Sequence, residues 1–135
     1  MNEKPIIRVR DVMKTNFDLV DRMTTVAEAI KSMKRLNTKA LIVDKRHSDD
    51  EYGMLLTSDI ARRVLGRGRS PDRVNVYEVM AKPVISVSPD MDIRYCAQLF
   101  ERFELSRAPV VERGEVIGIA SLTDLVLRGL CMTIY

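Results

Sequence analysis

The sequence of 135 residues is poor in the residue types on which catalytic and metal sites are built. His47 is its only histidine, and a single histidine in the polar segment KRHSDDE cannot supply the supported base of a nucleophilic triad. The two cysteines, Cys96 and Cys131, form no CxxC pair and indicate neither a zinc site nor a disulfide framework. The carboxylates at 49–51 are expected to be solvated in a loop rather than paired for acid–base work. We therefore expect a protein that is not an enzyme and carries no metal.

Long hydrophobic runs are also missing. No segment approaches the roughly 18 apolar residues of a membrane span. The N-terminal stretch MNEKPIIRVRDVM contains no apolar segment of signal-peptide length. Hydrophobic residues make up 46% of the sequence and charged residues 30%, which is typical of a soluble globular protein. We expect a cytoplasmic protein without a membrane segment.

An excess of one charge sign is present only locally. The net charge is +3, but six Lys and Arg residues lie between Ala61 and Lys82 against Asp72 and Glu78. Such a patch could meet phosphate, although a solvated connector is the simpler interpretation. Four tyrosines and three phenylalanines offer little for stacking on bases, so nucleic-acid binding is the weakest functional hypothesis.

The sequence repeats itself once. VRDVM, which begins at Val9, aligns with VYEVM, which begins at Val76, at an offset of 76 − 9 = 67. The same offset superposes two apolar stripes with helical spacing i, i+3, i+4, i+7. These stripes are Val26, Ala29, Ile30 and Met33 in the first copy and Ile93, Cys96, Ala97 and Phe100 in the second. KALIVD then matches RAPVVE at offset 107 − 39 = 68, and GMLLTSDI matches GIASLTDL at offset 118 − 53 = 65.

Each copy predicts the same order of elements. A short extended segment (FDLV or VISV) precedes a helix of about a dozen residues, two strands joined by a charged turn and a closing helix (IARRVL or LVLRGL). We place the first copy at 9–66, a connector at 67–71 and the second copy at 72–130. One copy of about 60 residues is marginal alone. We therefore expect a single module over 1–135, with the sheets of the two copies packed together about a pseudo-two-fold axis.

These segments, twice in the same order, resemble a tandem pair of CBS domains, the module named after cystathionine β-synthase. The resemblance rests on VxxVM, the PVV-like strand residues and the G-x-x-x-x-x-D pattern, and it covers about Val9 to Leu130. It implies an α+β fold made of two β-α-β-β-α repeats. It also implies a regulatory, non-catalytic module. In the family, two clefts accept adenine-containing ligands such as AMP, ADP, ATP, NAD(H) or S-adenosylmethionine.

A polar joint in the second copy allows two interpretations. Ser121-x-x-Asp124 fits a capping box, in which the serine accepts a bond from a first-turn amide and the aspartate reaches back. Alternatively, Asp124 accepts both hydroxyls of a ribose, while Ser121, Thr123 and the free amides at the helix start hold phosphate. The resemblance favours the nucleotide role, and the two interpretations are compatible.

The first copy departs from this pattern. Asp59 and Ser58 match the aspartate and threonine of the second copy. Leu56, however, occupies the position of the cap serine, and Thr57 stands one position further along. This loses one polar contact, so we expect the cleft of Asp124 to be better formed than the cleft of Asp59.

The resemblance further implies that each cleft takes its aspartate from one copy and a basic residue from the other. Arg107 is then expected to face the cleft of Asp59, and Lys39 to face the cleft of Asp124. Both cations suit a phosphate, Arg107 through a bidentate contact and Lys39 as a point charge. The alternative is that both are solvated charges at strand starts.

The adenine is expected beside backbone amides and small apolar residues. By family position, the adenine contacts are Val84 and Ile85 for the Asp59 cleft, and Phe17 and Asp18 for the Asp124 cleft. Ala108 and Ala40, just before the second strands, are small enough to let the ring approach. The alternative for each of these residues is plain packing. Asp18 stands where the second copy has Ile85, which either weakens the base pocket or provides a hydrogen bond to an amino-bearing base edge.

We therefore expect a regulatory adenine-nucleotide sensor that acts in trans on an effector protein not named by the sequence. Self-association as a homodimer through apolar helix faces is part of this expectation. The adenine nucleotide is a regulatory ligand here, and no catalytic cofactor is expected. The main alternative is a protein-interaction or dimerisation module that binds no small ligand.

Overall fold

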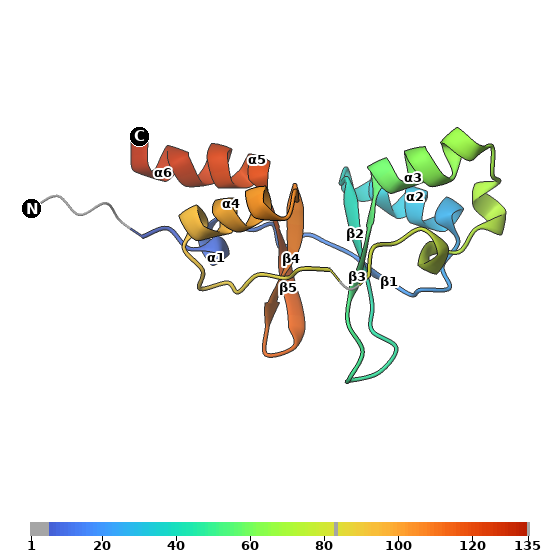
Figure 1. The fold of residues 1–135 in the computed structure, drawn as a ribbon, viewed down its shortest axis with the longest axis horizontal. Coiled ribbons are helices and arrows are strands. Elements are labelled where there is room, and N and C mark those ends of the chain that lie inside the picture. Colours follow the sequence, from blue (N-terminus) through green and yellow to red (C-terminus); the bar gives the residue numbers. More distant parts are fainter. Residues whose placement is uncertain (1–5, 83, 135) are drawn as a thin grey trace, which may run out of the picture. The chain divides into compact units, whose positions relative to one another are not determined.

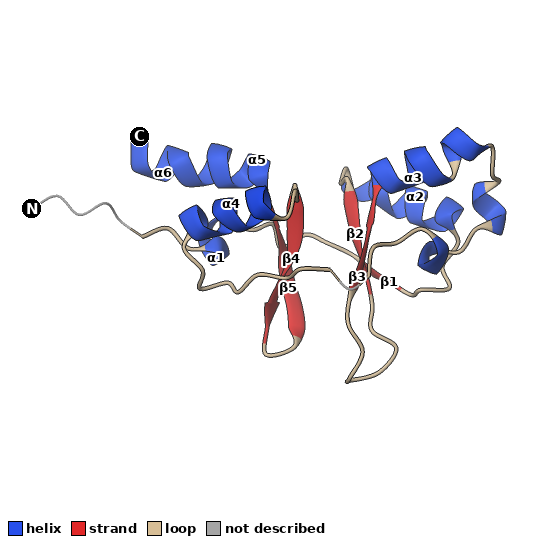
Figure 2. Ribbon diagram, viewed as in Figure 1, coloured by secondary structure: helices blue, strands red, loops and turns tan. Residues whose placement is uncertain are grey.

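A computed structural model describes residues 6–82 and 84–134 of the chain (Figure 1). These residues form two compact units, each with helices and a small sheet (Figure 2). Unit 2 is continuous and runs from Asn16 to Val84. Unit 1 combines the described residues up to Thr15 with those from Ile85 onward. The fold is therefore mixed α/β, and the packing of the two sheets against each other stays a prediction.

Unit 2 contains a three-stranded sheet in the order β1-β2-β3, in which β1 is parallel to β2 and β2 is antiparallel to β3. Its elements are β1 (Leu19–Val20), α2 (Val26–Leu36), β2 (Ala40–Val43), β3 (Gly53–Leu56), α3 (Thr57–Arg63) and three 3₁₀ turns, η1 (Leu65–Arg67), η2 (Pro71–Arg73) and η3 (Val76–Glu78). The Thr25 hydroxyl accepts from the Glu28 N–H and begins α2, and Asn37 ends it in a left-handed conformation with φ of 51°. The predicted helix therefore lies where its apolar stripe places it.

The hydrophobic core of unit 2 is formed by apolar side chains from its helices, strands and turns. Its buried members are Val26, Ala29, Met33, Leu41, Val43, Leu55, Ile60, Val64, Val74, Val76 and Val79. Val76 and Val79 come from VYEVM, the segment that opens the second sequence copy. This segment packs in the unit that contains the strands of the first copy.

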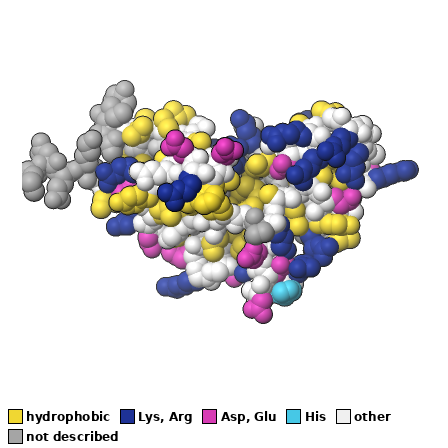
Figure 3. Space-filling model, in the orientation of Figure 1, with side chains coloured by type: hydrophobic (Ala, Val, Ile, Leu, Met, Phe, Trp, Pro, Cys, Tyr) yellow, Lys and Arg dark blue, Asp and Glu magenta, His cyan; other side chains and the backbone are white. Residues whose placement is uncertain are grey.

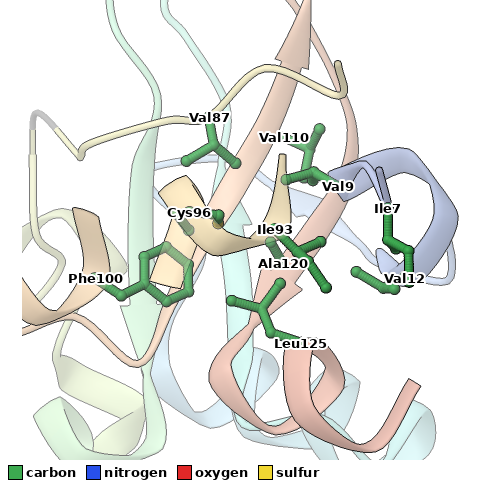
Figure 4. Close-up of a cluster of buried hydrophobic side chains, with 11 residues drawn as sticks. Ile7, Val9, Val12, Val87, Ile93, Cys96, Phe100, Val110, Ala120 and Leu125 are labelled. Atoms are coloured by element: carbon green, nitrogen blue, oxygen red, sulfur yellow. The ribbon is translucent and has the colours of Figure 1, made fainter. Parts of the chain in front are cut away.

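Unit 1 is built around an antiparallel hairpin of β4 and β5. Its elements are α1 (Val9–Val12), α4 (Ile93–Arg102), β4 (Arg107–Glu112), β5 (Glu115–Ser121), α5 (Leu122–Asp124), the π-helical turn η4 (Leu125–Leu130) and α6 (Cys131–Ile134). Figure 4 shows its core, which consists of Ile7, Val9, Val12, Val87, Ile93, Cys96, Phe100, Ala108, Val110, Ala120 and Leu125. Val9 and Val12 come from VRDVM, so the opening segment of the first copy packs with the strands of the second.

Two predicted elements of unit 1 differ from the structure. The segment VISV forms no continuous strand, because only Val87 exchanges backbone bonds with β4. The chain then turns away from the sheet. The carbonyl groups of Pro89 and Met91 accept hydrogen bonds from backbone N–H groups of α1 instead. The closing segment LVLRGL is a π-helical turn rather than a regular α-helix. There, the Arg128 guanidinium donates to the Val12 and Met13 carbonyl groups at 2.9 and 3.1 Å.

The glycine that opens each G-x-x-x-x-x-D pattern permits a close backbone approach. A Cβ on Gly118 would lie 2.8 Å from the Met13 sulfur and 2.9 Å from the Lys14 carbonyl oxygen. A Cβ on Gly53 would lie 2.8 Å from the sulfur of Met80. In both units the VxxVM segment therefore runs directly against the strand that leads to the polar joint.

Candidate functional site

The polar joint of unit 1 lies where β5 ends and α5 begins. The Ser121 hydroxyl oxygen accepts from the Asp124 N–H at 3.1 Å, which confirms the predicted cap. The hydroxyl also donates to Asp124 Oδ2 at 2.9 Å, so the aspartate reaches back to the side chain of the serine. Both residues are only 7% exposed, whereas Thr123 is exposed. This pair engages one carboxylate oxygen and leaves Oδ1 outside it, where it can accept from the hydroxyl of a ligand.

Arg107 and Ala108 lie beside this joint within the same unit. The register of the hairpin sets Arg107 opposite Ser121 and Ala108 opposite Ala120. Arg107 is half-buried and Ala108 is buried. Unit 1 therefore places Arg107 on β4, the strand that pairs with β5, and β5 ends at Ser121.

The joint of unit 2 holds its aspartate differently. Leu56 offers no hydroxyl, and Asp59 Oδ2 accepts from the Leu56 backbone N–H at 3.3 Å. Asp59 and Ser58 are half-buried, and Thr57 is exposed. The loss of a polar contact at this joint is confirmed. That the cleft of Asp124 is the better formed stays a prediction.

Lys39 and Ala40 lie beside the joint of unit 2. Ala40 pairs with Leu56 across the strands, and the Thr57 N–H donates to the Lys39 carbonyl oxygen at 3.0 Å. The side chain of Lys39 is exposed, and Ala40 is buried. Lys39 thus lies directly before β2 as an exposed cation, and its contact with a ligand phosphate stays a prediction.

The remaining predicted contacts are half-buried. Asp18 forms an ion pair with Arg35 at 2.5 Å, so a hydrogen bond from Asp18 to a base would compete with that guanidinium. Phe17 precedes it in the same extended segment. Val84 ends unit 2, and Ile85 begins the second segment of unit 1, both outside the strands. Each predicted cleft combines residues of both units, so the two clefts stay predictions.

Two features of unit 2 were not predicted from the sequence. A pocket of about 310 Å³ lies between α2 and α3. Its lining includes Ile30, Met33, Lys34, Asn37, Thr57 and Ile60. The sequence feature at this pocket is a difference in side-chain size between the two copies. Met33 corresponds to the larger Phe100, and Thr57 corresponds to Leu122.

The second feature corrects the prediction of solvated carboxylates at 49–51 for Asp50 alone, since Asp49 and Glu51 are exposed as expected. The Asp50 side chain is only 7% exposed and binds Arg46 at 3.0 Å and Lys82 at 2.8 Å. Hydrogen bonds from Arg46, and next from Lys82, hold the pKa of the Asp50 carboxyl well below its usual range. Lys82 follows 32 residues later, so sequence spacing gave no sign of this contact.

Among the described residues, no group of three or more His, Cys, Asp or Glu side chains could hold a metal ion. None of the described helices is long and apolar enough to cross a membrane. The candidate site residues are those of the two polar joints, together with Arg107 and Lys39 beside them.

Comparison with known proteins agrees with this arrangement. The family model "CBS domain" matches residues 9–66 and 76–129. The CBS domain-containing protein YhcV of Bacillus subtilis is 33% identical over 120 residues, which cover 89% of this chain and 84% of YhcV.

Solved structures show the same fold. A hexameric CBS-CP12 protein from bloom-forming cyanobacteria superposes with a TM-score of 0.89 at 35% identity, over 92% of this chain and 72% of that chain. The CBS domain pair of protein MJ0100, in complex with 5′-methylthioadenosine and S-adenosyl-L-methionine, superposes with a TM-score of 0.82 at 22% identity. That match covers 95% of this chain and 99% of the other. With both repeats matched by the family model, the chain belongs to the CBS domain family.

Proposed function

We propose that this chain is a regulatory module that binds an adenine-containing ligand and acts in trans on a partner protein. The observation that carries the proposal is the Ser121–Asp124 pair. Asp124 is buried in α5, its Oδ2 is held by the serine, and its Oδ1 lies outside the pair. A carboxylate fixed in this way is preorganised to accept the hydroxyl groups of a ribose.

Neighbouring residues support a ligand that also carries phosphate. Arg107, which the family resemblance assigns to the ligand of Asp59 rather than that of Asp124, carries a guanidinium that can contact phosphate oxygens bidentately. Lys39 supplies a second exposed cation at the corresponding edge of unit 2. AMP, ADP, ATP and NAD(H) combine a ribose with phosphate and are the ligands we propose to test first.

The relatives support the same class of ligand and a self-associated state. The CBS pair of MJ0100 binds two adenosine-containing compounds, and the CBS-CP12 protein is hexameric. We extend both properties to this chain as part of the proposal, with a homodimer as the simplest assembly. The proposed role is regulatory rather than catalytic, and the proposed location is the cytoplasm.

Thermal melting of the purified protein against AMP, ADP, ATP, NADH and S-adenosylmethionine tests the proposal. A ligand present at about 100 times its dissociation constant adds roughly 2.7 kcal/mol. For a domain of this size, that is a rise in Tm on the order of 10 °C. The matched variants are Asp124→Asn, which alters the proposed site, and Asp72→Asn, which makes the same change at an exposed position in a 3₁₀ turn.

The ligand-induced rise in Tm is compared within each variant, so a change in basal stability does not affect the result. We expect the rise to be retained in Asp72→Asn and lost in Asp124→Asn. Melting curves unchanged by every compound would contradict ligand binding. They would support the alternative, a module that works through protein contacts alone, which the ion pair of Asp18 and the Leu56 position also favour.

A further inference from the structure

The loop between β2 and β3 is longer than the matching turn of unit 1. The repeat offset falls from 68 before this loop to 65 after it, so the first copy is 68 − 65 = 3 residues longer here. In unit 1, residues 113–114 alone join β4 to β5. Figure 3 shows acidic and basic side chains next to one another in the lower part of the view, where Figure 1 places the longer loop. The charged loop is therefore a feature of one repeat.

This loop brings Asp50 to Lys82. Asp50 Oδ2 accepts from the Lys82 ammonium at 2.8 Å, and from the Arg46 backbone N–H and guanidinium at 2.9 and 3.0 Å. The side chain of Asp50 is 7% exposed and that of Lys82 is 22% exposed. A network of this kind, shielded from water, is screened less by salt than an isolated surface pair and holds its members more firmly. We call Arg46, Asp50 and Lys82 together the latch.

The latch acts on the chain where it leaves unit 2. Directly before Lys82, Ala81 pairs with Met54 of β3, and each of these two residues donates its N–H to the carbonyl oxygen of the other, at 2.9 and 3.0 Å. Two residues after Lys82 comes Val84, which ends unit 2. Val84 and Ile85 are the predicted adenine contacts of the Asp59 cleft, and both lie outside the strands. The latch therefore fixes the chain just before the segment that is expected to meet an adenine.

The other repeat supplies an internal comparison. At the offset of 67, Ala81 corresponds to Lys14, and Lys14 exchanges the same pair of backbone hydrogen bonds with Ile119 of β5. The position of Lys82, however, is occupied by Thr15, which is exposed and uncharged. The segment that leads to the adenine contacts of the second cleft thus has the backbone pairing but no ion pair at the matched position.

We propose that Asp50 is a positioning residue for the Asp59 cleft: through Lys82 it holds the chain so that the backbone of Val84 and Ile85 is ready to receive an adenine. This inference rests on the proposed function and assigns the latch to one of its two clefts. When a binding segment is ordered in only a fraction of the molecules, the apparent affinity falls by that fraction. The latch raises the ordered fraction before ligand arrives. It offsets the polar contact that this joint lacks relative to the other.

A direct contact of Lys82 with a ligand phosphate is the competing explanation, and it predicts an effect of opposite sign. In that case Asp50 competes with the phosphate for the ammonium group, so Asp50→Asn would lower the dissociation constant. For a latch, the same change frees the chain and raises the dissociation constant. Lys82→Gln raises it in both cases, whereas Lys82→Arg keeps a cation for Asp50 and should bind like wild type.

The test titrates AMP, ATP, NADH and S-adenosylmethionine into the full chain by calorimetry, one cleft at a time and well below the Tm of every variant. An Asp124→Asn background leaves the Asp59 cleft, and an Asp59→Asn background leaves the other. In the first background, Asp50→Asn and Lys82→Gln should each raise the dissociation constant on the order of tenfold. In the second, they should change it by no more than about twofold. Asp49→Asn, the same change at the exposed neighbouring position, should leave both clefts unchanged.

Amide hydrogen exchange of the ligand-free protein tests the step that precedes binding. The amides of Val84 and Ile85 should exchange faster, on the order of tenfold, in Asp50→Asn and Lys82→Gln than in wild type or Asp49→Asn. Unchanged exchange in both variants would show that the latch does not order this segment and would overturn the inference.

The titrations separate this inference from the proposed function. The positioning role would be overturned, and ligand binding left in place, by equal dissociation constants for Asp50→Asn and Asp49→Asn or by a tighter complex of Asp50→Asn. Binding that is lost in the Asp124→Asn background alone would have the same meaning. If wild type binds none of the four compounds, the proposed function fails and the positioning role fails with it.

Discussion

Replacement of Ser121 by Ala tests the physical basis of the polar joint. The hydroxyl accepts from the Asp124 N–H at 3.1 Å and donates to Asp124 Oδ2 at 2.9 Å, and both residues are 7% exposed. Loss of a helix cap costs about 1 kcal/mol. Leaving a buried carboxylate oxygen short of a donor adds about 1–3 kcal/mol. We expect the free energy of unfolding to fall by roughly 2–4 kcal/mol, and Tm to fall by roughly 10 °C.

Thr123→Ala is the matched control, since it removes a hydroxyl two residues away that is exposed. It should change stability by no more than about 0.5 kcal/mol. Urea unfolding of both variants gives the two free energies directly. Equal stabilities of Ser121→Ala and Thr123→Ala would refute the reasoning, because the buried pair would then contribute nothing beyond an exposed hydroxyl.

Three further outcomes follow from the packing. Gly118→Ala places a Cβ 2.9 Å from a backbone oxygen and should lower the free energy of unfolding, measured in urea, by about 1–3 kcal/mol. Because hydrogen bonds from Arg46 lower the pKa of Asp50, the charged carboxylate stabilises the fold above its unfolded pKa, and this stabilisation is lost as the pH falls. In Asp50→Asn, Tm should be lower at pH 7 and should fall less than in wild type below about pH 4. A thiol reagent should label exposed Cys131 in the native protein and Cys96 only on unfolding, since burial raises the pKa of the Cys96 thiol to about 11.

The helices were predictable because their signals are local. The apolar stripes begin at Val26 and Ile93, and α2 and α4 begin at these residues, directly after the capping side chains of Thr25 and Asp92. The cap at Ser121 was also predictable, since its pattern spans three residues. The extended segment VISV was not, because the backbone groups after Val87 turn to α1, which lies far away in sequence.

The exchange of the VxxVM segments could not be predicted for a related reason. Both copies carry the same apolar pattern, so either segment fits either set of strands by hydrophobicity alone. The ion pairs of Asp50 with Lys82 and of Asp18 with Arg35 depend on the folded loops in the same way. The pocket is lined by Met33, whose matched position in the other copy holds the larger, fully buried Phe100, and this size difference alone does not specify a pocket.

The discontinuity of unit 1 has a consequence for the order of folding. Unit 2 is an insertion, since residues 16–84 separate the two segments from which unit 1 is built. All buried members of the unit 2 core lie inside this one stretch of chain, so unit 2 can close its contacts without its neighbour. Unit 1 must bring Val9 and Val12 to Phe100 and Val110 across the whole insertion. We therefore expect unit 2 to fold first, because a folded insertion has less freedom than an unfolded one and lowers the entropy lost when the two segments of unit 1 meet.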